Sequence, residues 1–220
     1  MKSKFGNRVA VVAVALCFVL AWAASNNVHA DERTIKIVMI GDSLTEGKVP
    51  EIDRIPIQLE FALKAKGQSV AVINAGVGGD SAAKGLARLN RVVTDDTDAV
   101  ILALGWWDMD RGLDPNVTRA ALAAILSNLE ARRIAVLLCG VRAHTNFGDA
   151  HEKAFAAMFA NLAREYNVLF FPAINEAFAD DASLKAVDGL HPNAAGNKAV
   201  VKQILPTVEA LVDRARLRNR

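Results

Sequence analysis

Short apolar runs alternate with longer amphipathic segments along most of the chain. The predicted strands cover residues 35–40, 70–73, 99–104, 134–139 and 168–171. Between them apolar residues recur at helical spacing, and the predicted helices cover residues 54–66, 81–93, 116–132, 150–166 and 193 to the C-terminus. Strands this apolar are typical of a parallel sheet with helices on both faces. The pattern predicts a three-layer α/β/α domain around a five-stranded, doubly wound sheet of the flavodoxin-like type.

The first thirty residues depart from this pattern. Three basic residues precede an uncharged apolar stretch from Val9 to Ala24, and the small residue Ala30 stands directly before Asp31. This is the layout of a secretory signal peptide. An uncleaved membrane anchor is the alternative, but the stretch of about 16 residues is shorter than the roughly 20 that span a bilayer. We therefore expect residues 1–30 to be cleaved. Residues 31–220 then form one exported domain, periplasmic or secreted, with no stable membrane anchor.

Charge and cysteine content exclude several classes of protein. The 220 residues include 26 Lys and Arg against 24 Asp and Glu, so the chain lacks the basic excess typical of nucleic-acid-binding proteins. Two cysteines are too few for a disulfide scaffold or a four-cysteine zinc site. The spacing of His, Asp and Glu fits no metal site, and we expect no metal and no other cofactor. The helix patterns neither show nor exclude the exposed apolar patch that a dimer needs, and the expected state is a monomer or a weak dimer.

The residues that can carry chemistry follow the predicted strands, where the ligand site of a doubly wound sheet lies. Ser43 stands in a Gly-Asp-Ser turn after the first strand, and a Gly-Val-Gly-Gly segment at 76–79 follows the second. Asp188 and His191 precede the last helix. A hydrolytic triad needs a hydroxyl nucleophile, an imidazole base and a carboxylate that orients the imidazole. Asp188 can reach Nδ1 of His191 within one turn, which leaves Nε2 to face Ser43. The glycines can expose the backbone N–H groups that an oxyanion hole requires.

These segments resemble the sequence blocks of the SGNH (GDSL) hydrolases, in particular the bacterial periplasmic arylesterases, thioesterase I and lysophospholipases. The matching blocks are Gly-Asp-Ser-Leu-Thr-Glu-Gly at 41–47, Asn-Ala-Gly-Val-Gly-Gly-Asp-Ser at 74–81 and Asp-Gly-Leu-His-Pro-Asn at 188–193. The resemblance spans about residues 33–212. It implies that Ser43, Asp188 and His191 are catalytic and that the Ser43 and Gly79 amides bind the oxyanion. It also implies a small-molecule acyl ester as substrate: a carboxylic ester, a thioester or a lysophospholipid.

One block departs from the family pattern. The family has Gly-Gly-Asn-Asp after the third strand, and the Asn side chain donates to the oxyanion. Here the sequence is Gly-Trp-Trp-Asp at 105–108, so Trp107 occupies the Asn position. Loss of one oxyanion donor typically costs a factor of roughly 10²–10³ in rate. The Trp at this position therefore bears directly on whether the chain is active.

Three interpretations of this departure remain open. In the preferred one the chain is an active esterase with a weaker or remodelled oxyanion hole, in which the indole N–H of Trp107 is a candidate substitute donor. In the second, Trp106 and Trp107 reshape the pocket, and His144 or Asn146 supplies the donor. In the third, catalysis is lost and the chain is a periplasmic binding protein. Substrate contacts are expected from Trp106, Arg142, His144 and Asn146, and hydrolysis of carbohydrate O-acetyl esters is the alternative activity.

Three aspartates close to these blocks are expected to have structural roles. Asp42 is predicted to form hydrogen bonds beneath the turn that carries the nucleophile. Asp80 and Asp108, which follow the second and third strands, are predicted to anchor loops rather than to act as acids. None of the three is therefore included among the residues expected to take part in the reaction.

Overall fold

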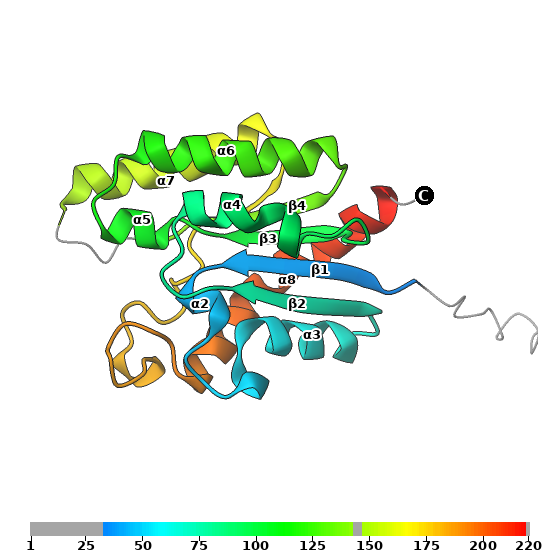
Figure 1. Ribbon diagram of the computed structural model, residues 1–220. Helices are drawn as coiled ribbons and strands as arrows, with labels where there is room; N and C mark the ends of the chain where they lie inside the picture. The colour runs from blue at the N-terminus through cyan, green and yellow to red at the C-terminus, as the bar shows by residue number, and fades with distance from the viewer. Residues whose placement is uncertain (1–32, 143–146, 219–220) are drawn as a thin grey trace, which may run out of the picture. The chain divides into compact units, whose positions relative to one another are not determined.

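The described residues, 33–142 and 147–218 of the computed structural model, are built around a sheet of five parallel strands (Figure 1). The strands are β1 (Ile35–Gly41), β2 (Val70–Gly76), β3 (Ala99–Ala103), β4 (Ala135–Cys139) and β5 (Leu169–Phe171). Their order in the sheet is β2-β1-β3-β4-β5. This is the order of flavodoxin-like sheets, in which the topological switch point lies between β1 and β3. The predicted fold class is confirmed.

Helices cover both faces of the sheet (Figure 1). On one face lie α4 (Ala82–Val92), α5 (Trp106–Asp110), α6 (Pro115–Ala131) and α7 (Asp149–Glu165). On the other lie α2 (Ser43–Glu46), α3 (Ile55–Ala65) and α8 (Ala194–Arg218). Two short 3-10 helices, η1 (Glu51–Asp53) and η2 (Ala182–Leu184), stand in the connections. Helix α6 packs against α4 and α7, and α3 packs against α8, so each layer is continuous.

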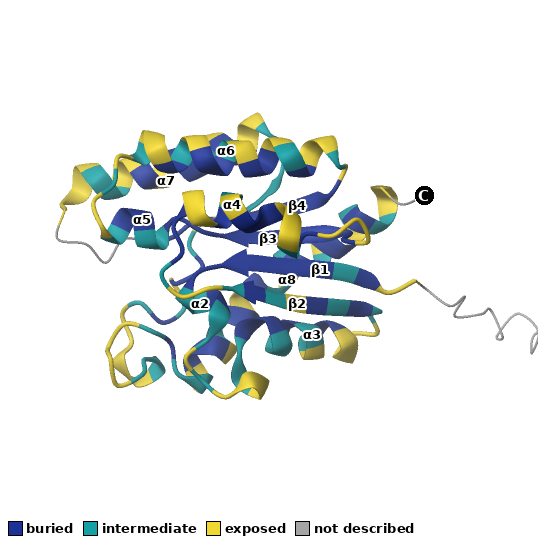
Figure 2. Ribbon diagram, in the orientation of Figure 1, coloured by how far each residue is buried: buried dark blue, intermediate teal, exposed yellow. Residues whose placement is uncertain are grey.

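Burial explains why the strands read as apolar runs. Every residue of β3 and of β4 is buried, because these strands have neighbours on both sides and helices above and below (Figure 2). A residue in such a strand cannot alternate between water and core, so the two-residue period of a half-exposed strand is lost. The edge strand β2 shows more exposure, with Ile73 43% exposed.

The register of the sheet brings three loops together. Gly41, at the end of β1, pairs with Gly76 of β2 on one side and with Ala103 of β3 on the other. The segments that follow these three strands therefore start side by side at the carboxyl edge. This is the edge at which the sequence predicted the functional residues.

The predicted elements agree with the structure except at short segments. The second strand continues three residues beyond the predicted 70–73, to Gly76. Helices α2 and α5 have four and five residues, too few to show a helical period in the sequence. The predicted signal peptide, residues 1–30, lies outside the described residues. Within 33–142 and 147–218, no helix combines the length and apolarity needed to cross a bilayer.

Candidate active site

Ser43 is the first residue of the one-turn helix α2, which begins directly after β1. Asp42 caps this helix, because its Oδ1 accepts a hydrogen bond from the Leu44 N–H at 3.1 Å. Gly41 lets the chain turn back over the strand end, since a Cβ there would lie 2.0 Å from Thr45 Oγ1. The Gly-Asp-Ser sequence thus forms a tight turn at the carboxyl edge of the sheet, and Ser43 lies at its tip.

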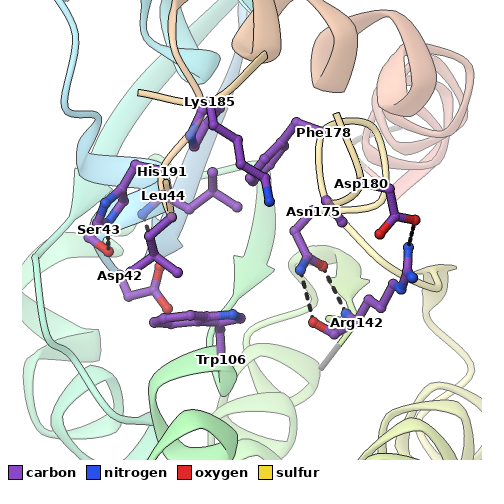
Figure 3. A pocket seen from close by; sticks show the side chains of 13 residues that line it. Asp42, Ser43, Leu44, Trp106, Arg142, Asn175, Phe178, Asp180, Lys185 and His191 are labelled. Atoms are coloured by element: carbon purple, nitrogen blue, oxygen red, sulfur yellow. Dashed lines mark hydrogen bonds and ion pairs between the residues drawn. The ribbon is translucent and has the colours of Figure 1, made fainter. Parts of the chain in front are cut away.

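Ser43, His191 and Asp188 form a continuous hydrogen-bonded array. His191 Nε2 lies 2.8 Å from Ser43 Oγ, and His191 Nδ1 lies 2.7 Å from Asp188 Oδ2. With the Nδ1 proton directed to the carboxylate, Nε2 is free to accept the hydroxyl proton. Figure 3 shows the imidazole and the Ser43 hydroxyl facing each other at the cavity. The structure therefore brings together the three residues that the sequence marked out, although 148 positions separate Ser43 from His191.

The Asp188 carboxylate is held in its ionised form by its own turn. Its Oδ1 accepts hydrogen bonds from the His191 N–H at 3.0 Å and the Leu190 N–H at 2.9 Å. These two amides, followed by the His191 ring, lower the pKa of Asp188 to about 2. At neutral pH the carboxylate is therefore charged and able to orient the imidazole.

Asn193 fixes the turn that carries His191. Its Nδ2 donates to the carbonyl oxygens of Ser183 and Lys185 at 2.8 and 3.0 Å. Its Oδ1 accepts from the Gly196 N–H at 3.0 Å, in the first turn of α8. The His-Pro-Asn sequence thus links the segment before the turn to the helix after it. The backbone that carries the imidazole is therefore held rigidly.

The loop after β2, which carries Gly79, is tied to the end of β1. Arg88 of α4 donates from Nε to Asp80 Oδ2 at 2.6 Å and from Nη2 to the Gly41 carbonyl at 3.1 Å. Both side chains of this ion pair are more than nine-tenths buried. Asp80 is therefore a loop anchor, as predicted. Arg88, its partner, was not anticipated.

The main-chain amides of Ser43 and Gly79, both at this edge, donate no hydrogen bond within the described residues. The Ser43 amide is unpaired because it stands at the start of α2, where no preceding turn exists. Gly79 adopts φ +76°, a conformation that favours glycine. Unpaired N–H groups of this kind are the elements from which oxyanion holes are built.

The two tryptophans of α5 have different surroundings. Trp106 lines the cavity beside Ser43 (Figure 3). Trp107 lies instead against the loop after β2, since a Cβ on Gly79 would be 3.8 Å from the indole Nε1. Lys84 Nζ and Arg111 Cζ each lie 5.5 Å from the Trp107 ring centroid, which is within cation–π range. In the described part of the chain, the Trp107 N–H makes no hydrogen bond.

Asp108 fixes this short helix against α4. Its Oδ2 accepts a hydrogen bond from the Ala82 N–H at 2.9 Å, and the side chain is buried. Burial raises the pKa of Asp108 above its usual value. The carboxylate is directed to the first turn of α4, so the prediction that Asp108 anchors a loop is confirmed.

A cavity of about 180 Å³ opens next to Ser43 and His191. Its wall is mainly apolar and includes Leu44, Trp106, Phe178, Ala179, Leu190 and Pro192. Arg142, one of the residues predicted to contact substrate, stands in the wall together with Asn175, Asp180 and Lys185. His144 and Asn146, the other two expected contacts, lie outside the described residues. In the described residues, no group of three or more His, Cys, Asp and Glu side chains is arranged to hold a metal ion.

Asp42 lies beneath the nucleophile turn, as predicted, and lines the same cavity. It is 3% exposed, and its Oδ2 has no hydrogen-bond partner in the described part of the structure. Burial therefore dominates and raises the pKa of Asp42 to about 6. The bond from the Leu44 amide and the nearby His191 act in the opposite direction and are weaker.

Comparison with known proteins identifies the family. The model of the GDSL-like lipase/acylhydrolase family matches residues 39–199, which contain all three residues of the hydrogen-bonded array. The chain belongs to this family. As a GDSL-like acylhydrolase it is an esterase, and the resemblance seen in the sequence is confirmed.

Two relatives support this placement among the GDSL hydrolases. The chain is 32% identical to an arylesterase of Vibrio mimicus over 165 residues, which are 74% of this chain and 82% of the relative. It is 28% identical to the thioesterase 1/protease 1/lysophospholipase L1 of Escherichia coli over 179 residues, covering 80% of this chain and 85% of that one.

Solved structures agree with the GDSL assignment. The crystal structure of TesA superimposes with a TM-score of 0.76 at 26% identity, covering 80% of this chain and 99% of that one. The crystal structure of AlinE4, an SGNH-hydrolase family esterase, superimposes with a TM-score of 0.68 at 35% identity, covering 81% and 96%. The sheet and its helical layers are thus those of the SGNH hydrolases.

Proposed function

We propose that this GDSL-family chain is a serine ester hydrolase that works through an acyl-enzyme on Ser43. Ser43 Oγ attacks the acyl carbonyl while His191 Nε2 takes the hydroxyl proton. Asp188 holds the imidazole in the required tautomer and stabilises the imidazolium that forms. His191 then gives its proton to the leaving group, and water hydrolyses the acyl-serine by the same route. The observation that carries the proposal is the unbroken array from Ser43 through His191 to Asp188, with contacts of 2.8 and 2.7 Å.

We propose that the oxyanion is bound by the Ser43 and Gly79 amides and by the indole N–H of Trp107. All three groups are donors without an acceptor in the described residues, and Trp107 Nε1 lies beside Gly79. Lys84 and Arg111 pack against the indole ring and hold it in place. Their positive charge also makes the N–H a stronger donor, because a cation near the ring withdraws electron density from it. Trp107 thus takes the part that the family gives to Asn.

The cavity favours a small acyl ester as the substrate. Its volume of about 180 Å³ is below the roughly 300–1,000 Å³ of pockets that enclose drug-sized ligands. An arylesterase and a thioesterase/lysophospholipase among the relatives support carboxylic esters and thioesters as the candidate classes. The volume favours short acyl groups over the long chains of lysophospholipids. Acetyl groups on carbohydrates fit the same space and are the second candidate.

The proposed activity is tested with p-nitrophenyl esters from acetate to decanoate. Wild-type protein is expected to hydrolyse the short esters best, with Ser43→Ala at least about 10³-fold slower. Trp107→Asn restores the family residue and is expected to stay within about tenfold of wild type, since an amide N–H replaces an indole N–H. Equal rates for wild type, Trp107→Asn and Ser43→Ala would contradict the proposal. The third interpretation of the sequence, a binding protein without activity, would then lead.

We also propose that residues 1–30 act as a signal peptide and that the mature protein is exported to the periplasm. The support is the basic, apolar and small-residue order of this segment. N-terminal sequencing of the protein recovered from the periplasmic fraction tests it. A mature chain that begins at Asp31 is expected, and full-length protein confined to the membrane or the cytoplasm would contradict export.

A further inference from the structure

Most polar groups in the cavity wall form hydrogen bonds or ion pairs with one another. The Arg142 guanidinium donates to Asp180 Oδ2 at 2.6 Å and to Glu176 Oε1 at 3.4 Å. The Asn175 side chain accepts from the Arg142 N–H and donates to the Arg142 carbonyl, both at 2.8 Å. Asp42 lines the cavity, and its Oδ2 has no partner among the described residues, but that atom is buried from solvent. These groups build the wall and have little capacity left for a ligand.

Lys185 differs from its neighbours in the wall. Its side chain is half-buried, and within the described residues its ammonium makes no hydrogen bond and no ion pair. Figure 3 shows the side chain directed into the cavity, on the side where Phe178 and Leu44 also lie. Because this ammonium has no counter-ion among the described residues, it is available to an anionic group that enters the cavity.

The backbone of Lys185 is fixed relative to His191. Lys185 forms an isolated antiparallel bridge with Pro192, the residue after the imidazole. The Ala186 N–H donates to the His191 carbonyl at 2.8 Å, and Asn193 Nδ2 donates to the Lys185 carbonyl at 3.0 Å. The Lys185 backbone is therefore held in a fixed position next to the turn that carries His191. The ammonium can move only as far as the lysine side chain extends from it.

We propose that Lys185 binds an anionic group, a carboxylate or a phosphate, carried by the ester only a few atoms from the scissile bond. This inference rests on the proposed hydrolase function and names the class of substrate: short esters that are apolar around the carbonyl and negatively charged at one end. The apolar wall fits the part of the ester around the carbonyl, and the unpaired Lys185 ammonium fits the anionic end. The small volume keeps the two parts close together.

The test compares esters that differ only in charge. Monoethyl succinate carries a carboxylate on the acyl side, and ethyl levulinate replaces it with a neutral methyl ketone of nearly the same shape. Acetoxyacetate and acetoxyacetamide form the matching pair for the alcohol side, and acetoxyethyl phosphate tests a phosphate. We expect wild-type kcat/KM to favour at least one anionic ester over its neutral partner by about tenfold, with the preference shrinking as salt is raised.

Variants of Lys185 show whether the ammonium causes the preference. Lys185→Met keeps the apolar stem and removes the charge, and we expect the ratio of anionic to neutral kcat/KM to fall to about one. Lys185→Arg is expected to restore most of the ratio. Lys202→Met, which removes an exposed lysine of α8 outside the cavity, is the matched control and is expected to leave the ratio unchanged.

The outcomes separate this inference from the function on which it rests. Ser43-dependent hydrolysis with no anionic preference in wild type, or with a preference that survives Lys185→Met, overturns the role of Lys185 and leaves the hydrolase intact. Hydrolysis that is no slower in Ser43→Ala overturns the hydrolase itself. A merely structural role for Lys185 lowers the rates of charged and neutral esters together and does not change their ratio.

Discussion

The indole of Trp107 faces Gly79 closely enough that a β-carbon on that glycine would lie 3.8 Å from Nε1. The sequence alone shows only that a tryptophan has replaced an asparagine. The structure adds that the replacement retains an N–H donor at the same edge of the sheet, next to an unpaired amide. This placement supports the proposal that the departure from the family pattern exchanges one donor for another.

Removing that donor is the first prediction. Trp107→Phe keeps an aromatic ring beside Lys84 and Arg111 but has no N–H. We expect kcat on a short p-nitrophenyl ester to fall by a factor of roughly 10²–10³ with little change in KM, because the bond is made to the oxyanion and not to the ground-state carbonyl. Steady-state kinetics measure both constants. A Phe variant as fast as wild type would show that the indole N–H takes no part.

Asp42 gives the folded protein a distinct pH dependence. A carboxyl group whose pKa is raised from 3.8 to about 6 binds more protons in the folded state than in the unfolded state. Its contribution to the free energy of unfolding is therefore complete below about pH 4 and is lost as the pH rises through 6, by about 3 kcal/mol in total.

Asp42→Asn removes this titration while an amide oxygen can still accept from the Leu44 N–H. We compare the free energy of unfolding of wild type minus that of the variant at each pH. We expect this difference to be larger near pH 4 than near pH 7, with most of the change falling between about pH 4 and 6. Urea unfolding at a series of pH values measures the difference, and subtraction cancels the other carboxylates. A difference that does not depend on pH would contradict the shifted pKa.

The buried pair of Arg88 and Asp80 is predicted to hold the loop after β2, which carries Gly79. Arg88→Met leaves the Asp80 carboxylate buried without its cation, and we expect a loss of about 3–5 kcal/mol in the free energy of unfolding. Arg119→Met, which breaks an exposed pair with Glu165, is the control and is expected to cost less than about 1 kcal/mol. Equal losses in the free energy of unfolding for the two substitutions would show that the buried Arg88–Asp80 pair contributes no more to stability than an exposed pair.

Much of this molecule could be predicted from the sequence because its signals are local or repeated. The apolar runs of β3 and β4 and the helical spacing of α6 required only neighbouring residues. Ser43, Asp188 and His191 could be paired because each follows or precedes an element whose place at the sheet edge was already expected. Asp42, Asp80 and Asp108 received correct structural roles from their positions in turns.

The features that could not be predicted depend on contacts between residues far apart in the sequence. Such contacts do not affect the spacing of apolar and polar residues along the chain. Arg88 reads as one more polar residue of a helix, and only the fold shows it reaching back to Gly41. In the sequence Lys185 looks like any lysine in a loop. Only the structure shows that it lines the cavity and that the polar groups near it form hydrogen bonds with one another. The orientation of Trp107 toward Gly79 depends on how a five-residue helix sits, and such a helix is too short to predict from periodicity.

The central claim, that Ser43 is a nucleophile activated by His191, is tested most directly by covalent labelling. Paraoxon, a phosphate triester with a p-nitrophenol leaving group, is incubated with the protein, and the adduct is located by mass spectrometry of peptides. We expect one diethylphosphoryl group on Ser43 in wild type, none in Ser43→Ala, and much slower labelling in His191→Ala. A label on another residue, or labelling of Ser43 at the same rate without the imidazole, would contradict the account.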